Sequence, residues 1–311
     1  MLDLDSVQAA ARRIAPHVFR TPVLRKELGS GATLFLKPEN LQVTGSFKVR
    51  GAFNRMLLLP AECRGIVAHS SGNHARAVAH AGRVLAIPTT IVVPSTIPAA
   101  KRDPVVEDGA TVVTVGPDSE ERKERAIEIA AREGLSLVAP YDDFEVMAGQ
   151  GTMVVELLED AGALDRLYAP VSGGGLIAGC ATAFSALGGG ATIGVEPESA
   201  DDTRQSLAAG RRVGIPPPET IADGLCVRIP GEKTWPIVQA FVSRVETVTD
   251  EEIRDAMAFA LHRLKLVVEP SGAASLACAL REGEGRCGVI LSGGNVEPTL
   301  LAEVADGPRR W

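Results

Sequence analysis

The sequence predicts an α/β fold with two open, mostly parallel twisted sheets that carry helices on both faces. Short β-branched runs alternate with longer amphipathic segments, and polar or glycine-rich turns follow several of these runs. Strands that alternate with helices form parallel sheets, and ligands bind where strand ends meet helix starts. A chain of 311 residues is long enough to bury a complete core.

The predicted strands are short and rich in valine, isoleucine and threonine. They cover residues 33–37, 66–70, 89–93, 111–115, 136–140, 167–171, 192–196 and 289–292. A helical pattern follows each run, and no repeat or flexible linker separates them. We expect a small mobile domain at 65–142, tightly integrated with a large domain formed by 1–64 and 143–311.

Composition and charge favour a cytoplasmic protein with small-molecule ligands. The net charge of −7 and the aromatic content of 4% disfavour a nucleic-acid partner. The five cysteines form no CxxC pair and fit a reducing compartment. The N-terminus lacks the pattern of an export signal. The uncharged stretch 167–195 has the length of a membrane span, but its glycines predict a strand, a turn, a helix and a second strand.

The turn after the strand at 167–171 is suited to binding a phosphate. It contains Ser172, Gly173, Gly174 and Gly175 at the start of a helix. Glycines let several backbone amides and the helix dipole approach one anion. The alternative is a tight turn in which glycine only relieves crowding, and we interpret the glycines at 188–190 as such a loop.

Two other strand ends carry polar clusters. Ser70, Ser71, Gly72, Asn73 and His74 follow one strand, and helix capping explains one of these residues but not the whole cluster. The segment 292–295, Ser-Gly-Gly-Asn, follows the last strand, where an ordinary N-cap is the alternative. The chain has no GxxxxGK[ST], no GxGxxG after its first strand and no GxSxG, which disfavours an ATPase, a dehydrogenase and a serine hydrolase.

Lys48 lies between the strand at 33–37 and a helix predicted to begin at Ser46. A cation in the first turn of a helix opposes the helix dipole, so a structural role is poorly motivated. A solvated surface lysine is the alternative.

Four motifs occur in order along the chain: Ser46-Phe47-Lys48, the cluster 70–74, the turn 172–175 and the segment 292–295. Together with AGQGT (148–152), PPETIADG (217–224) and EPSGA (269–273), they resemble the fold-type II pyridoxal-phosphate enzymes, in particular threonine/serine dehydratases and serine racemase. The resemblance covers nearly the whole chain. It implies a tryptophan synthase β-like fold, an amino-acid substrate and a homodimer.

The resemblance implies pyridoxal 5′-phosphate as the cofactor, with Lys48 as the lysine that bonds to it. The phosphate is implied to bind the segment 172–176, the ring hydroxyl Asn73 and the ring nitrogen Ser292. The full implied set of cofactor contacts is Phe47, Lys48, Asn73, Ser172, Gly173, Gly174, Gly175, Leu176, Gly224 and Ser292. The implied substrate contacts are Ser70, Ser71, Gly72, Asn73, His74 and Arg122. The implied catalytic residues are Lys48, which takes the α-proton, and Ser71, which returns a proton from the opposite face in the racemase branch.

A divalent-cation site is implied by the segment GVEPESADD. Glu196, the carbonyl of Ala200 and Asp202 resemble the site of the serine racemase branch, and oxygen ligands suit Mg²⁺ or Ca²⁺. An acidic helix start would explain Asp201 and Asp202 but not Glu196.

Three features bear on specificity and regulation. Arg122 resembles an arginine that reaches a dicarboxylate, and an i,i+4 surface pair with Asp118 is the alternative. Arg76 stands in place of a glutamine and Asp108 in place of a tyrosine of the mammalian racemases, so we do not expect activation by ATP. Few residues follow Asn295, so we expect no regulatory domain and no feedback inhibition by isoleucine.

The leading functional expectation is an ammonia-lyase (dehydratase) that converts serine, threonine or 3-hydroxyaspartate to a 2-oxo acid and ammonia. One alternative is a serine or aspartate racemase with side elimination activity. Another is a specialised catabolic dehydratase, such as one that serves hydroxyectoine utilisation. A silent ligand-binding homologue is disfavoured, because Lys48, Asn73 and Ser292 are all present.

Overall fold

The computed structural model describes residues 2–307 and contains two sheets. The six-stranded sheet has the order β1 (Leu24–Glu27), β2 (Thr33–Pro38), β10 (Arg286–Leu291), β7 (Arg166–Pro170), β8 (Ala191–Pro197) and β9 (Arg244–Val248). The four-stranded sheet has the order β5 (Thr111–Val115), β4 (Thr89–Pro94), β3 (Ile66–His69) and β6 (Ser136–Leu137). Among these strands only the pair β1 and β2 is antiparallel, so the predicted fold class is confirmed.

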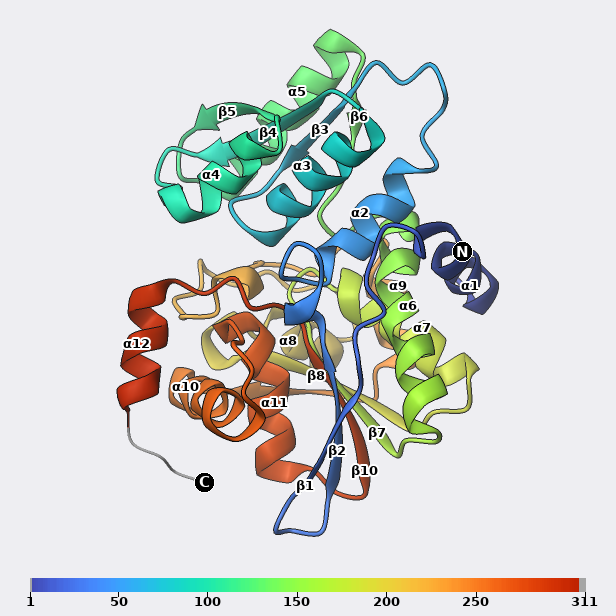
Figure 1. Cartoon of the computed structure of the whole chain (residues 1–311), viewed down its shortest axis with the longest axis vertical. Helices are drawn as coiled ribbons and strands as arrows, with labels where there is room; N and C mark the ends of the chain where they lie inside the picture. The colour runs from blue at the N-terminus through green and yellow to red at the C-terminus, as the bar shows by residue number, and fades with distance from the viewer. Residues whose placement is uncertain (1, 308–311) are drawn as a thin grey trace.

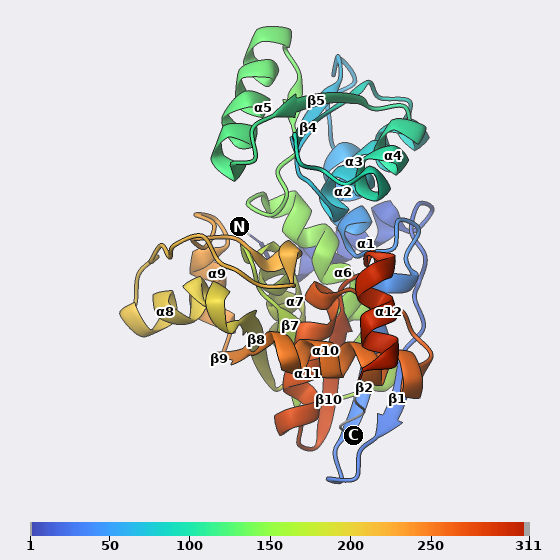
Figure 2. The same ribbon diagram turned by 90° about the vertical axis from the view of Figure 1, so that its left-hand side faces the viewer.

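The two sheets occupy opposite ends of the molecule, and helices surround each of them (Figure 1, Figure 2). The α-helices are α1 (Leu4–Ile14), α2 (Lys48–Met56), α3 (Asn73–Leu85), α4 (Ala99–Glu107), α5 (Ser119–Glu133), α6 (Phe144–Ala161), α7 (Gly175–Ala186), α8 (Asp202–Ala209), α9 (Trp235–Phe241), α10 (Asp250–Phe259), α11 (Pro270–Glu282) and α12 (Pro298–Asp306). Short helical turns are η1 (Glu39–Leu41), η2 (Glu198–Ala200), η3 (Asp223–Leu225) and the π-helical η4 (Ala260–Leu264). The strands of the four-stranded sheet all lie between residues 66 and 137, while the domain boundaries stay a prediction.

Sequence patterns missed the two edge strands of the six-stranded sheet. β1 reads Leu-Arg-Lys-Glu and β9 reads Arg-Val-Glu-Thr-Val, and both contain charged residues because an edge strand is only partly buried. β6 ends at Leu137 although a strand was predicted to residue 140. Pro140 has no N–H for a sheet ladder, and the chain turns there toward α6.

α2 begins at Lys48 and not at Ser46 as predicted. The backbone of Ser46 forms an isolated bridge with Gly293, and the N–H of Phe47 donates to the carbonyl of Ser292. These bonds tie the approach to α2 to the end of β10. The first helical residue is therefore Lys48.

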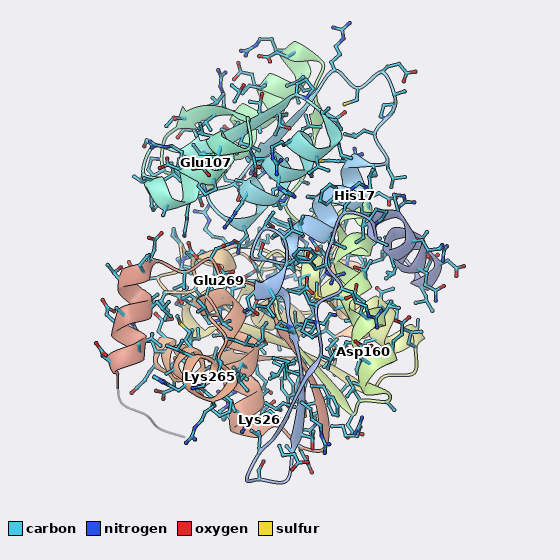
Figure 3. All side chains as sticks on the ribbon, in the orientation of Figure 1. His17, Lys26, Glu107, Asp160, Lys265 and Glu269 are labelled. Atoms are coloured by element: carbon cyan, nitrogen blue, oxygen red, sulfur yellow. The ribbon has the colours of Figure 1, made fainter. Side chains whose placement is uncertain are left out.

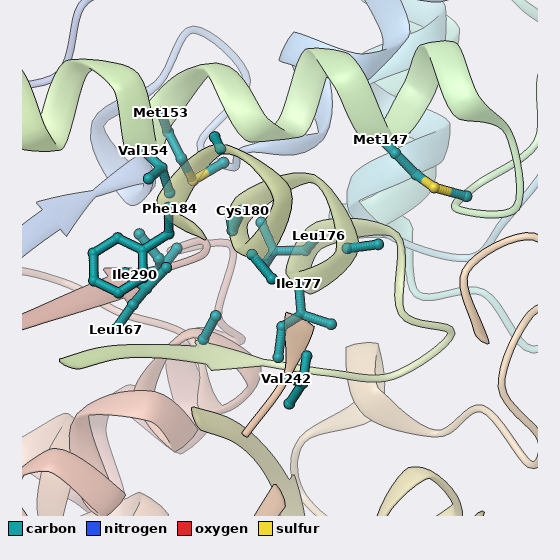
Figure 4. Packing of buried hydrophobic residues seen from close by; sticks show 14 of the residues in the cluster. Met147, Met153, Val154, Leu167, Leu176, Ile177, Cys180, Phe184, Val242 and Ile290 are labelled. Carbon is teal, nitrogen blue, oxygen red and sulfur yellow. The ribbon is translucent and has the colours of Figure 1, made fainter. Parts of the chain in front are cut away.

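Side chains of β7 alternate between the two faces of the six-stranded sheet. Leu167 and Ala169 pack in the cluster formed with α6 and α7, which Figure 4 shows from close by. Tyr168 packs on the other face, among residues of α10 and α11. The stretch 167–195 forms β7, α7 and most of β8, as predicted. No helix within residues 2–307 is both long and apolar enough to cross a membrane.

The four-stranded sheet is covered in the same way. Ile66 and Ala68 of β3 pack with residues of α2, α3 and α4, while Val67 packs with residues of α5. α2 contacts both α3 and α6, so it joins the helices of one sheet to those of the other.

A buried network of charged side chains fixes α2. The guanidinium of Arg50 is fully buried and donates to Glu39 over 2.7 and 2.9 Å and to Glu156 over 2.7 and 2.9 Å. Lys37 is buried as well, and it donates to Glu156 over 2.6 Å. Two cations thus meet two carboxylates inside the protein. Loss of one partner would leave an unpaired charge in the interior.

Replacing Arg50 by methionine should lower the free energy of unfolding by about 3 to 5 kcal/mol, because the buried Glu39 would lose its cation and Glu156 would keep only Lys37. Arg20→Met is the matched control, since Arg20 also bonds two carboxylates, Glu159 and Asp160, but its side chain is half exposed. The control should lose less than about 1 kcal/mol. Urea denaturation measures both variants, and equal losses would show that burial of the network contributes nothing.

Candidate active site

One cavity of about 810 Å³ collects the residues predicted to bind cofactor and substrate. Residues that follow β3, β7 and β10 line it, so both sheets contribute strand ends. The predicted residues in its wall are Phe47, Lys48, Ser70, Ser71, Gly72, Asn73, His74, Arg122, Ser172, Gly173, Gly174, Gly175, Leu176, Gly224 and Ser292. The predicted metal ligands Glu196, Ala200 and Asp202 are not part of this wall.

Lys48 lies in the cavity wall at the first turn of α2. Its Nζ donates a hydrogen bond of 2.7 Å to the carbonyl of Pro140 and lies 5.2 Å from the centroid of the Phe47 ring. Burial lowers the pKa of Lys48 to about 8, although the charge of Glu269 opposes this shift. An amine with this pKa has an appreciable neutral fraction near pH 7 and can act as a nucleophile or a base.

The turn after β7 presents backbone amides at the start of α7. Ser172 has a φ of 66° and Gly174 a φ of 92°, both in the left-handed region. A Cβ at Gly173 would fall 2.5 Å from the ring of Tyr141, so no larger residue fits there. Glycine therefore relieves crowding and opens the turn at the same time. No side chain caps α7, and free amides at the positive end of a helix bind a phosphate.

The polar cluster before α3 does not cap that helix through a serine. The N-cap is Gly72, and no side chain makes a cap hydrogen bond. Ser70 accepts a hydrogen bond of 3.2 Å from the N–H of Gly72, so it stabilises the turn. Capping therefore does not explain Ser71. His74 is buried, and burial with the nearby charge of Lys48 lowers the pKa of His74 to about 3, so its ring is neutral at pH 7.

Sequence analysis assigned no role to several residues of the cavity wall, among them His69, Tyr141 and Glu269. Glu269 lies at the end of α11 that faces the four-stranded sheet (Figure 3). Its carboxylate accepts a hydrogen bond of 2.6 Å from Asn73, and burial raises the pKa of Glu269 to about 8. Burial and two cations of α5 lower the pKa of His69 to about 4. The EPSGA motif was the one sequence signal that could have singled out Glu269.

Arg122 of α5 is part of the cavity wall and not half of a surface pair. Its Nη1 donates to the carbonyl of Pro117 over 2.7 Å, and burial lowers the pKa of Arg122. Asp118 instead caps α5, because it accepts a hydrogen bond from the N–H of Glu120. In the described structure Arg122 and Asp118 form no ion pair, so that interpretation is wrong. Lys123 stands beside Arg122 in the wall.

The predicted metal ligands meet at the start of α8. Glu196 accepts hydrogen bonds from the backbone N–H groups of Thr203 (3.1 Å) and Arg204 (3.0 Å), so the helix start does explain Glu196. Asp202 differs, because both of its carboxylate oxygens are buried without a hydrogen-bond partner. Burial and the neighbouring Glu196 raise the pKa of Asp202 to about 8, and burial raises that of Glu196 to about 7. Residues 2–307 contain no cluster of three or more His, Cys, Asp or Glu side chains that could hold a metal.

Known proteins are similar to this sequence over almost its full length. Residues 14–293 match a family described as pyridoxal-phosphate dependent enzyme. The chain is 42% identical to L-threo-3-hydroxyaspartate ammonia-lyase of Saccharomyces cerevisiae over 96% of each chain. It is 42% identical to serine racemase of Arabidopsis thaliana, over 95% of this chain and 93% of that protein.

Solved structures agree with these sequence matches. Maize serine racemase superimposes with a TM-score of 0.93 at 40% identity, over 97% of this chain and 96% of that chain. The buried lysine and the glycine turn lie within the matched residues 14–293. The chain therefore belongs to the family of pyridoxal-phosphate dependent enzymes.

Proposed function

We propose that the protein is a pyridoxal-phosphate-dependent ammonia-lyase that dehydrates a β-hydroxy-α-amino acid, with 3-hydroxyaspartate as the preferred substrate. The observation that carries the proposal is a buried lysine amine of lowered pKa that shares one cavity with a glycine turn suited to phosphate. The similarity to an ammonia-lyase named for 3-hydroxyaspartate supports the reaction and the substrate.

The cavity wall fits the phosphate of the cofactor. A Cβ atom at Gly173 or Gly175 would lie only 2.5 or 2.7 Å from Tyr141, so neither position has room for a side chain. The turn therefore exposes backbone amides to the cavity. Its amides and the dipole of α7 would hold the phosphate. The other residues that would hold the cofactor are Phe47, Lys48, Asn73, Leu176, Gly224 and Ser292, all in the same wall.

Lys48 would move the proton of the substrate α-carbon. When bound, the cofactor would supply an electron sink that makes the proton on this carbon acidic. The carbonyl of Pro140 orients the Nζ of Lys48, and its pKa of about 8 leaves enough neutral amine to accept the proton. In the net reaction the β-hydroxyl would leave as water with the proton removed from the α-carbon. The enamine released would tautomerise to an imine, which water hydrolyses to a 2-oxo acid and ammonia.

The cavity offers two places for carboxylates. The start of α3, with the cluster 70–74, presents the positive end of a helix to the substrate α-carboxylate. Arg122 and Lys123 add two cations to the same wall, beside a neutral His69, and Glu120 of that wall lies 3.6 Å from the Nζ of Lys123. A second carboxylate on the substrate would pair with these cations, and serine and threonine have none.

Wild-type protein should release oxaloacetate from L-threo-3-hydroxyaspartate with a lower KM than it shows for L-serine or L-threonine, because only the dicarboxylate meets Arg122 and Lys123. A 2-oxo acid assay measures this. Lys48→Ala should lose all elimination and the visible absorbance of covalently bound cofactor. Lys101→Ala is the control and should keep both elimination and absorbance, since Lys101 also lines the cavity but pairs with Asp223. Turnover by a Lys48→Ala protein that binds cofactor would reject the assignment.

We propose in addition that Glu196, the carbonyl of Ala200 and Asp202 bind Mg²⁺ or Ca²⁺. The two buried oxygens of Asp202 without partners support this, because a buried carboxylate is costly unless it is paired. Two carboxylates, a carbonyl and water molecules form an oxygen set of the kind these cations prefer. A cation there would tie the end of β8 to the start of α8.

Chelator should lower the melting temperature of the protein, and Mg²⁺ or Ca²⁺ should restore it, because a ligand that binds only the folded state stabilises it. Asp202→Asn should melt at a temperature that metal does not change. Asp201→Asn is the matched control and should keep the response, since Asp201 already bonds Gln205. Identical melting curves of the wild type with chelator and with metal would contradict the site.

Ser71 favours racemisation as a second activity. Inversion of the α-carbon requires a proton on the face opposite Lys48, and a hydroxyl in the cavity wall can deliver it. Ser71 makes no cap hydrogen bond, so it has no capping role that would explain it. The similarity to serine racemase of Arabidopsis thaliana supports this activity.

Wild-type protein should racemise serine or aspartate slowly beside dominant elimination, and Ser71→Ala should remove the racemisation while sparing elimination of the L-substrate. Chiral chromatography of the remaining substrate measures both. Stability should fall by less than about 0.5 kcal/mol, because no cap is lost. If residual L-serine and L-aspartate stay optically pure over many wild-type turnovers, the racemase activity is rejected.

The homodimer, the cytoplasmic location and a specialised role in hydroxyectoine utilisation stay predictions of the sequence.

A further inference from the structure

A chain of hydrogen bonds crosses between the two sheets in the cavity wall. Nη1 of Arg76 donates to Oδ1 of Asn295 over 2.7 Å, and Nδ2 of Asn295 donates to Oδ1 of Asn73 over 2.6 Å. Nδ2 of Asn73 then donates to Oε1 of Glu269 over 2.6 Å. Arg76 and Asn73 lie on α3, whereas the other two residues follow β10 and precede α11. We call this chain the Arg76 relay.

The donors of the relay all point from Arg76 toward Glu269. An arginine can only donate and a carbonyl can only accept. Asn295 contacts one group of each kind. Its Oδ1 accepts from Arg76, and its Nδ2 also donates to the carbonyl of Thr44 over 3.0 Å. These two partners fix which end of the Asn295 amide carries the oxygen. Asn73 must then present its oxygen to Asn295, and its Nδ2 keeps a second N–H for a ligand in the cavity.

Asn295 sits in a place shaped for it. A Cβ at Gly45 would fall 2.6 Å from Oδ1 of Asn295, and Gly45 has a φ of 73° that side chains rarely adopt. Arg76 and Asn73 are one turn apart on α3, so both of their bonds to Asn295 hold the same turn of the helix. The relay therefore ties the start of α3 to the six-stranded half of the molecule.

We propose that Arg76 is a positioning residue for the cofactor. By fixing Asn295 it orients the amide of Asn73, so that an N–H and not the oxygen meets the ring hydroxyl. This inference rests on the proposed role of Asn73 toward the cofactor. Without Arg76 one determinant of the Asn295 orientation is lost, and a rotated Asn73 would place its oxygen against another oxygen. Arg76 acts through two other side chains and needs no contact with the cofactor.

The test measures the dissociation constant of pyridoxal phosphate for apoprotein reconstituted with the free cofactor. Arg76→Met should raise it about tenfold, the scale of one charge-assisted hydrogen bond. Arg76→Lys and Arg76→Gln should both be milder, because lysine and glutamine each carry an N–H group that can still donate to Oδ1 of Asn295. Arg83→Met is the matched control on the same helix, where Arg83 bonds Asp108, and should change the constant by less than about twofold.

A second readout separates positioning from general stabilisation. Asn295→Ala should weaken binding like Arg76→Met, and the double variant should bind no worse than Asn295→Ala alone, because both changes break one relay. The visible absorption maximum of bound cofactor should move in Arg76→Met but not in Arg83→Met. Circular dichroism of each apoprotein checks folding, and Arg76→Ala, which also lacks a donor, provides the comparison if the methionine variant misfolds.

The inference is overturned if Arg76→Met binds pyridoxal phosphate with the affinity and spectrum of Arg83→Met. Additive losses in the double variant overturn it as well. A wild-type protein that fails to bind pyridoxal phosphate would overturn the proposed function together with the inference, whereas active wild-type protein with unaffected Arg76 variants would overturn the inference alone.

Discussion

The position of Lys48 depends on the buried charges that hold α2. Arg50 is two residues further along the helix, so its side chain projects about 200° away from that of Lys48. On that side Glu39 and Glu156 bind the guanidinium with no part of it exposed. Rotation or sliding of α2 would separate buried opposite charges at a large cost. The ion pairs of Arg50, which lie outside the cavity, therefore fix the position of the Lys48 amine in the cavity wall.

The cavity wall combines elements of both sheets. The helix dipoles and the ionisable side chains of this wall explain which ligands the cavity can bind. α3 and α7 both begin at the cavity wall, so the positive ends of two helix dipoles face the same cavity. Burial acts on the ionisable groups of the wall in the expected directions, because it lowers the pKa of Lys48 and raises that of Glu269. Both shifts favour the neutral forms. The cavity therefore attracts anionic ligands while its lysine stays available as a base.

Asp202 differs from the other buried carboxylates of residues 2–307, because Glu39, Glu196 and Glu269 all accept hydrogen bonds. Arg50, Lys37 and their two carboxylates satisfy each other at distances below 3 Å. Glu196 is satisfied by the amides of α8. Asp202 is as deeply buried, yet neither of its carboxylate oxygens has a partner. A buried carboxylate without a partner is costly, and the proposed cation site rests on this feature.

Local sequence by itself determined the type of most elements and the chemistry of the turns. The runs at 89–93 and 111–115 became β4 and β5, and the glycines at 173–175 became the turn before α7, because residue type and periodicity act over a few neighbours. Tertiary structure alone decided which turns meet. Arg76 and Asn295 are 219 residues apart in sequence, and no local pattern links them. The hydrogen bond from Lys48 to the carbonyl of Pro140 also could not be predicted from local sequence. Every residue has a backbone carbonyl, and only the fold decides which one lies next to the lysine amine.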